Sequence, residues 1–157
     1  DYLRSEFRDE YDKVIFSRDW HAPDTDNGGH FSDEPDFVNT WPAHCVRGTA
    51  GAEFHPSVAG LYRDAVVSKG MDEPAYSAFE GTVDDEGGTL HEYLQAHVIT
   101  SVDVVGIAYD YCVKATAMDA RKHGYSTRVL AEMTAAVNPM NIEPTEEMRV
   151  AGIEVSF

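Results

Sequence analysis

The stretch at residues 104–117, VVGIAYDYCVKATA, changes within a few residues from a strand-like pattern to a helix-like pattern. The segment from Val102 to Ala108 is apolar on both faces, which is typical of a parallel strand that helices cover on both sides. The segment from Val113 to His123 is helical in character, and Gly124 suits the position just after the end of such a helix. A buried strand that leads directly into a helix indicates an α/β fold.

The same alternation of apolar runs and helix-like segments recurs along the chain. We expect further strands at residues 13–17, 65–68, 128–130 and 153–155, and helices at residues 2–8, 89–96 and 144–151. Strands that alternate with helices predict a mainly parallel sheet with helices on both faces. We therefore expect a three-layer, doubly wound α/β fold that forms a single domain over residues 1–157. Such a fold normally begins with a strand, but this sequence opens in an apparent helix, so we expect its first strand to be missing.

The charge balance of the sequence is strongly acidic. It has 28 acidic and 12 basic residues, a formal net charge of −16. Such a surface repels nucleic-acid phosphates and anionic lipid, so we expect no nucleic-acid partner and no membrane partner. No apolar run reaches the ~20 residues of a membrane span and no secretion leader opens the chain, which predicts a cytoplasmic protein. The composition leaves open whether the chain forms a homo-oligomer and whether the acidic surface reflects a salt-rich habitat.

Residues 19–56 have no sustained helical or strand period, and loops of this length are usually functional. Asp19 and His21 lie two residues apart, so in an extended chain both side chains point the same way and can reach one ion. His30 and His44 follow in the same segment. Three imidazoles and a carboxylate suit one divalent ion such as zinc, iron or manganese better than magnesium or calcium. The spacing alone fits a polar loop with scattered histidines as well.

Cys112 stands where the predicted strand gives way to the predicted helix. A helix N-terminus lowers the pKa of a thiol and can bind an oxyanion, which suits a nucleophile. The alternative is a small buried side chain, because free cysteine is often fully buried. Lys69 follows the predicted strand at residues 65–68, and the carboxyl ends of parallel strands share one edge of a sheet. We therefore expect Lys69, Cys112 and Asp19 on one edge, although a lone lysine at a strand end is more often solvent-exposed.

Five segments of the sequence together match a known pattern. They are SRDWH (17–21), WPAHCVRGT (41–49), KG (69–70), YSAFEG (76–81) and VGIAYDYCV (105–113). On these segments the chain resembles the nicotinamidase/pyrazinamidase branch of the isochorismatase-like cysteine hydrolases. The segments span nearly the whole chain in the family's order. The tryptophan-proline-x-histidine-cysteine motif and the strand before the second cysteine are specific in combination.

The resemblance implies a reaction and a metal site. The reaction would be the hydrolysis of nicotinamide, and of pyrazinamide-type amides, to the acid and ammonia, a step of NAD salvage that passes through a thioester on Cys112. Lys69 would be the lysine of the catalytic triad. The ligands of one divalent ion, zinc, iron or manganese, would be Asp19, His21, His30 and His44.

The resemblance also implies how the substrate is held. Trp41 is similar to the aromatic residue that packs on the substrate ring, and Tyr76 would help to wall the pocket. The bond between Ile107 and Ala108 resembles a non-proline cis peptide bond of the family. The backbone amides of Ala108 and Cys112 would then form the oxyanion hole of the reaction.

The sequence departs from the family in one place. The family's triad includes an aspartate at the end of its first strand, which acts as general base and acid, and the strand expected to be missing would carry it. Asp110 lies two residues before Cys112, but we expect the geometry of the strand end to direct it elsewhere. Two alternatives therefore stay open: another isochorismatase-like hydrolase, or an inactive metal-binding remnant.

Overall fold

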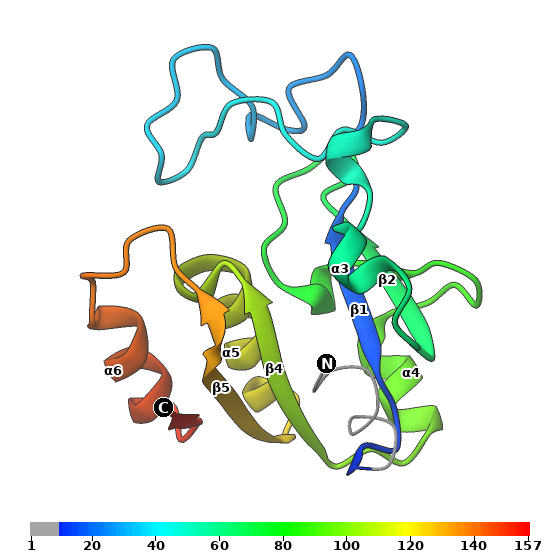
Figure 1. Cartoon of the computed structure of the whole chain (residues 1–157), viewed down its shortest axis with the longest axis vertical. Helices are drawn as coiled ribbons and strands as arrows, with labels where there is room; N and C mark the ends of the chain where they lie inside the picture. Colours follow the sequence, from blue (N-terminus) through cyan, green and yellow to red (C-terminus); the bar gives the residue numbers. More distant parts are fainter. Residues whose placement is uncertain (1–9) are drawn as a thin grey trace. The chain divides into compact units, whose positions relative to one another are not determined.

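The computed structural model describes residues 10–157, so the helix predicted at residues 2–8 lies outside the described residues. The chain divides into two compact units: the first is residues 1–75 with residues 81–88, and the second is residues 76–80 with residues 89–157. Each unit combines a three-stranded sheet with helical segments (Figure 1). The single domain expected over residues 1–157 stays a prediction.

The sheet of the first unit has the strand order β1-β2-β3. β1 (Ile15–Asp19) and β2 (Ala65–Lys69) pair in parallel, so the strands predicted at residues 13–17 and 65–68 are confirmed with shifted ends. β3 (Thr82–Val83) pairs with β2 in the antiparallel direction. The sequence does not predict β3 because two residues are too few to show an apolar period.

A long loop connects β1 with β2, as the missing period of this segment predicts. Its regular elements are two short turns, η1 (Ala50–Ala52) and α3 (Pro56–Ala59). Asp36 shapes another part of the loop, because its carboxylate accepts hydrogen bonds from the backbone amides of residues 38–40. These bonds, the one from Thr40 foremost, hold the pKa of the Asp36 carboxyl well below its usual range. Hydrogen bonds within the loop, rather than helices or strands, therefore set its path.

Asp64 fastens the start of β1 to the end of this loop. Its carboxylate accepts hydrogen bonds from the Val14 amide at 2.8 Å and from the Tyr62 hydroxyl at 3.0 Å, and it lies 3.2 Å from Lys13 Nζ. Burial raises the pKa of this carboxyl, but the bonds from Val14, Tyr62 and Lys13 outweigh burial, so the pKa is lowered. The ionised form of Asp64 therefore stabilises the approach of β1 to β2.

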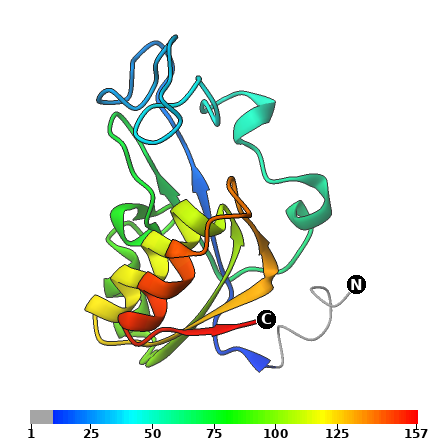
Figure 2. The same cartoon turned by 90° about the vertical axis from the view of Figure 1, so that its left-hand side faces the viewer.

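The sheet of the second unit is parallel throughout and has the order β4-β5-β6. Its strands are β4 (Ser101–Ile107), β5 (Ser126–Ala135) and β6 (Glu154–Ser156), at the three places where the sequence predicts them. The crossover helices α5 (Lys114–Lys122) and α6 (Glu143–Val150) lie side by side on one face of this sheet (Figure 2). The expected alternation of strand and helix is thus confirmed. Within residues 10–157 the strands form two sheets rather than one, because no described strand pairs with both β1 and β4.

Three further helical elements belong to the second unit. They are η2 (Ala78–Glu80), α4 (Leu90–Ala96) and η3 (Tyr109–Val113). Thr89 caps α4 in a capping box with Glu92, in which each side chain accepts the other residue's backbone amide. Gly124 has a φ of +91° directly after α5 and its cap, as expected for the residue that ends a helix.

The core of the second unit lies between its sheet and the helices α5 and α6. Its buried side chains are those of Tyr109, Val113, Ala117, Val129, Met148, Ile153 and Val155. Ala117 on α5 is fully buried and carries only a methyl group, so the helix can approach the sheet closely, and Met148 on α6 fills the space beside it. The packing of this core holds β4 and η3 in place for the site described below.

We expect the Asp64→Asn variant to lose about 1–2 kcal/mol of unfolding free energy at pH 7, because the charge is lost and only one of the two acceptor oxygens remains. The lowered pKa means that this contribution is present above the unfolded value near 3.8 and is lost as the pH falls through the folded value. The difference between wild type and variant should therefore shrink below about pH 4. Urea unfolding at several pH values measures it. Asp85→Asn, in an exposed turn, is the control, and an equal loss in both variants would contradict the assignment.

Candidate active site

Three histidines of the first unit gather in one place. His21, His30 and His44 each offer one ring nitrogen, and these three atoms all lie within 4.8 Å of one another. His21 and His30 are buried, and His44 is partly buried. The sequence predicts these same three residues as metal ligands, and the structure brings them together.

Two short backbone pairings fold the long loop so that the histidines meet. The His21 amide donates to the Cys45 carbonyl at 3.1 Å, and the Arg47 amide donates to the His21 carbonyl at 2.9 Å. Further along the loop, the Trp41 amide donates to the His30 carbonyl at 2.9 Å. His44 lies between Trp41 and Cys45, which take part in these pairings, so the pairings bring its ring close to the rings of His21 and His30.

The hydrogen bonds of the rings fix which nitrogen faces the cluster. His21 Nδ1 lies 2.7 Å from the Gly70 carbonyl oxygen, and His44 Nδ1 lies 2.8 Å from the Pro42 carbonyl oxygen. A carbonyl only accepts, so each Nδ1 carries the proton and each Nε2 keeps a lone pair. Within residues 10–157, His21 Nε2 is buried and has no hydrogen-bond partner. A buried lone pair of this kind, with a carbonyl behind the ring, is the arrangement of a metal-ligating histidine.

The two buried rings of the cluster, those of His21 and His30, favour the neutral form. Burial, with smaller contributions from the neighbouring His21 and His44, lowers the pKa of His30 to about 4. Burial also lowers the pKa of His21, although the Gly70 carbonyl and the Asp19 carboxylate act in the opposite direction. Neutral imidazole is the form that binds a metal. The donor set therefore fits a divalent transition-metal ion.

Gly70 is a residue of the site to which the sequence assigns no role, although it belongs to one of the matching segments. Its φ is +73°, and a Cβ atom placed on it would lie 2.5 Å from His21 Cε1 and 2.8 Å from His21 Nδ1. Only glycine leaves room for the imidazole while its own carbonyl binds that ring. The signal in the sequence is a glycine directly after a strand-ending lysine, and it could be interpreted only once the partner ring was known.

Asp19 and Lys69 form an ion pair at the carboxyl ends of β1 and β2. The strand register sets them side by side, and Lys69 Nζ donates to Asp19 Oδ1 and, at 2.9 Å, to the Ala75 carbonyl. Lys69 is only 3% exposed, so the alternative of a solvent-exposed lysine is wrong. Asp19 is not one of the three residues that gather, and its Oδ1 accepts from Lys69. Its role as a metal ligand stays a prediction.

Trp41 belongs to the same loop as the histidines. Its amide donates to the His30 carbonyl, and Trp41 and Phe31 form an isolated parallel β-bridge. The ring of Trp41 lies edge-on to the ring of Phe37, with 6.1 Å between the ring centroids. Its backbone is thus fixed beside the histidine cluster. The predicted contact of Trp41 with a substrate ring stays a prediction.

Cys112 lies in the second unit, inside a helical turn rather than before one. The sequence predicts that the helix begins at Val113, but helical structure begins at Tyr109 with the π-helical turn η3. The sequence of η3, YDYCV, does not show the apolar period of a helix, so the sequence analysis did not predict this turn. The amides of Tyr111 and Val113 donate to the Ala108 carbonyl at 3.1 Å and 3.0 Å, which places Cys112 in the first turn after β4.

The peptide bond between Ile107 and Ala108 is cis. The resemblance implies this bond at this position, and the structure has it there. Ala108 follows β4 directly and precedes η3, so Ala108 and Cys112 are both part of the backbone between β4 and α5. The oxyanion hole predicted from these two amides stays a prediction.

Tyr76 lies beside the turn that carries Cys112. Its ring and the ring of Tyr111 are 5.7 Å apart and tilted by 35°. The Ala78 amide donates to Thr116 Oγ1 on α5 at 3.0 Å, which holds the segment around Tyr76 against that helix. Tyr111 is an aromatic neighbour of the cysteine that the sequence analysis missed. Its place directly before Cys112 is the signal that points to it.

The predicted residues thus fall into two groups. The histidines, Asp19, Lys69 and Trp41 belong to the first unit, and Cys112, Ala108 and Tyr76 belong to the second. The structure assembles each group. That both groups act on one substrate stays a prediction.

The family model and the similar proteins of known function point to the same protein family. The isochorismatase domain model matches residues 3–153. The nicotinamidase/pyrazinamidase of Mycobacterium tuberculosis is 46% identical over 93% of this chain and 77% of its own length. The nicotinamidase of Escherichia coli is 33% identical over 88% of this chain and 72% of its own length.

Solved structures agree with the sequence comparison. The pyrazinamidase of Pyrococcus horikoshii in complex with zinc has a TM-score of 0.76 at 34% identity, covering 96% of this chain and 78% of that chain. PnC1 from L. infantum in complex with nicotinate has a TM-score of 0.73 at 35% identity, covering 92% of this chain and 74% of that chain. The α/β architecture with parallel strands is therefore that of these structures. The helices within residues 10–157 are too short or too polar for any of them to span a membrane.

We expect the purified chain to bind about one divalent ion, and the His21→Ala variant to retain far less, because one of three clustered imidazoles is removed. Metal content after dialysis, measured by mass spectrometry of the elements, checks this. His97→Ala is the matched control, since His97 lies at the end of α4 and outside the cluster. Equal metal content in both variants would show that the cluster is not the metal site.

We expect Gly70→Ala to weaken metal binding by about 10- to 100-fold, because the added methyl displaces His21 and its carbonyl partner, as the loss of an outer-shell contact does elsewhere. Gly87→Ala is the control for backbone strain, since Gly87 has a φ of +70° but no atom within 4 Å of an added Cβ. Competition with a metal-sensitive dye measures both affinities. A similar affinity in the two variants would mean that the Gly70 contact does not matter.

Proposed function

The chain belongs to the isochorismatase domain family, and on that premise we propose that it is a metal-containing cysteine amidohydrolase that converts nicotinamide to nicotinate and ammonia. The observation that carries the proposal is the cluster of three histidines in a chain whose relatives are nicotinamidases. The other isochorismatase-like hydrolases are the alternative, and they generally lack the aspartate and three-histidine set. The reaction would serve NAD salvage in the cytoplasm.

The proposed chemistry begins at Cys112. Its thiolate attacks the carboxamide carbon, so a C–S bond forms and the carbonyl oxygen becomes an oxyanion. The backbone amides of Ala108 and Cys112 stabilise that oxyanion. The oxyanion then collapses and the C–N bond breaks. The leaving nitrogen takes up the proton that the Cys112 thiol gave up, which the family's triad aspartate would carry, so that it departs as ammonia and a thioester remains. Water attacks the thioester, which releases nicotinate and restores the thiol.

The remaining residues support this sequence of steps. Lys69, the buried lysine of the triad, supplies positive charge that favours a thiolate and steadies the developing oxyanion. Trp41 and Tyr76 contact the flat ring of the substrate, since aromatic faces stack on one another. The small-molecule substrate is neutral, so the acidic surface does not hinder its approach.

The metal would be held by His21, His30 and His44, with Asp19 as a further ligand. When bound, a divalent ion such as zinc, iron or manganese supplies a Lewis-acidic position for the ring nitrogen of the substrate. The carbonyls behind His21 and His44 keep the ligating nitrogens aimed at that position. His21, His30 and His44 thereby orient the ring, while Cys112 carries the bond-breaking step.

We expect the metal-loaded protein to release ammonia from nicotinamide. The Cys112→Ala variant should lose activity by about 10⁴-fold or more, because the nucleophile is gone while metal and fold remain. The His44→Ala variant should lose both metal and activity. A coupled ammonia assay measures the rates, with an N-carbamoyl amide as the comparison substrate and His97→Ala as the control.

Two results would contradict this proposal. If the metal-loaded wild type releases no ammonia from nicotinamide but hydrolyses the N-carbamoyl amide, the chain is another hydrolase of the same family. If Cys112→Ala stays active, the nucleophile is assigned to the wrong residue.

A further inference from the structure

The turn that carries Cys112 has an unusual backbone shape. η3 is a π-helical turn of five residues between β4 and α5. Such turns are rare, are wider than an α-helical turn and occur frequently at functional sites. In this one the Tyr111 and Val113 amides share a single acceptor, the Ala108 carbonyl, and the Lys114 amide donates to the Tyr109 carbonyl. Side chains of the turn then tie it to neighbouring elements.

Asp110 ties this turn to the end of β5. Its side chain is nearly buried, with 9% exposed, and its Oδ1 accepts from the Val137 amide at 2.9 Å. Its Oδ2 accepts from the Asn138 amide at 2.8 Å. Bonds from amides to a carboxylate are stronger than bonds between neutral groups. Both oxygens are thus directed at residues 137–138, which agrees with the expectation that Asp110 is not the base.

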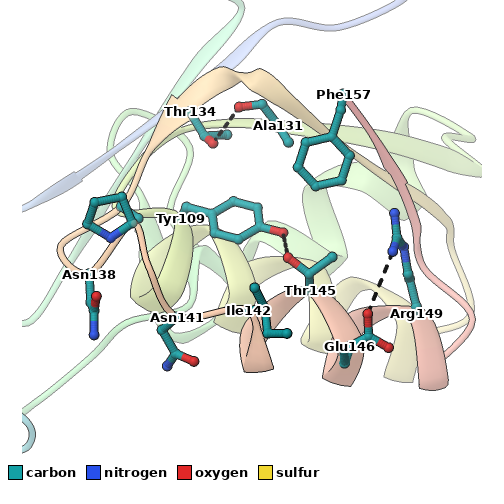
Figure 3. A pocket seen from close by; sticks show the side chains of 12 residues that line it. Tyr109, Ala131, Thr134, Asn138, Asn141, Ile142, Thr145, Glu146, Arg149 and Phe157 are labelled. Carbon is teal, nitrogen blue, oxygen red and sulfur yellow. Dashed lines mark hydrogen bonds and ion pairs between the residues drawn. The ribbon is translucent and has the colours of Figure 1, made fainter.

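Tyr109 ties the same turn to α6. Its hydroxyl oxygen lies 2.6 Å from Thr145 Oγ1, and its ring is buried. The ring lines a cavity of about 380 Å³. In Figure 3, Thr134 and Phe157 lie across this space from the Tyr109 ring. Tyr109 therefore anchors the turn on the α6 side, and the paired bonds of Asp110 anchor it on the side of residues 137–138.

We propose that Asp110 is a positioning residue, which holds η3 in the shape that presents Cys112 to its substrate. The inference rests on the proposed function, since it assigns Asp110 a role in presenting the nucleophile. Asp110 touches neither the substrate nor the reacting atoms. It acts through the two backbone amides that it binds and through Tyr111, the one residue that separates it from Cys112.

A simple charge effect of Asp110 would have the opposite sign. A carboxylate near a thiol disfavours the thiolate, so removal of that charge alone would lower the thiol pKa and speed its alkylation. Loss of positioning would instead move the thiol away from the helix N-terminus, raise its pKa and slow its alkylation. The direction of the change separates the two roles.

The test uses Asp110→Asn and Asp110→Ala in the complete protein. Asparagine removes the charge and keeps one acceptor, and alanine removes both acceptors. Glu147→Gln is the matched control, because Glu147 on α6 accepts from Lys114 Nζ at 2.8 Å and so also joins the start of α5 to α6, at an exposed site. Two readouts are compared in folded protein: the pH profile of Cys112 alkylation by iodoacetamide, followed on the peptide that carries Cys112, and kcat and KM for ammonia release.

We expect both Asp110 variants to alkylate more slowly at pH 7, with the profile shifted to higher pH. We expect kcat to fall on the order of 10- to 100-fold while KM changes much less, since displacement of a catalytic group by about 1 Å has effects of that size. Glu147→Gln should match the wild type in both readouts. Loss of stability alone would lower the melting temperature and leave the alkylation profile of folded molecules unchanged.

Unchanged or faster alkylation in folded Asp110→Asn would overturn the positioning role. If the wild type releases no ammonia but both variants still alkylate slowly, the proposed function fails and the effect of Asp110 on the thiol stands. If the wild type releases ammonia and the variants match it in both readouts, the function stands and the inference fails.

Discussion

The parallel register of β1 with β2 determines where the first unit places its reactive groups. Asp19 is paired with Lys69 in this register. Just beyond the ends of the two strands, the His21 ring lies against the Gly70 carbonyl. Side chains of a strand alternate between faces, so a slip of one residue would separate both pairs at once. One ladder of backbone hydrogen bonds therefore fixes both an ion pair and the orientation of an imidazole. Asp64 supports that ladder at its other end.

The sequence predicted what depends on local patterns. The longer elements have apolar periods, so β1, β2, β4, β6 and the helices α4, α5 and α6 were predicted to within a few residues, and β5 was predicted without its second half. The three histidines share one loop that the pattern marks as irregular. What it could not predict depends on contacts between distant segments. The need for glycine at Gly70 comes from a ring far away in sequence, and Asp110 in η3 accepts hydrogen bonds from residues beyond β5. Contacts of this kind produce no periodic pattern in the sequence.

Local burial, and not the net charge, decides the state of the histidines. A chain with a formal charge of −16 would be expected to favour protonated imidazoles. The pKa of His30 is nonetheless lowered to about 4, because desolvation acts at the ring itself while surface charges are screened over about 8–10 Å. The neighbouring rings also repel a proton from one another. A site for cations can thus form from neutral groups inside a strongly acidic protein.

The long loop between β1 and β2 has almost no core of its own. Between residues 20 and 64, all of them described, the buried apolar side chains are those of Ala22 and Ala52. Ordering such a segment costs conformational entropy that so little burial does not offset. An ion shared by His21 and His44 would act as a covalent crosslink does, since it removes the entropy of a closed loop from the unfolded chain. The metal would then be as much a structural staple of this segment as a part of its chemistry.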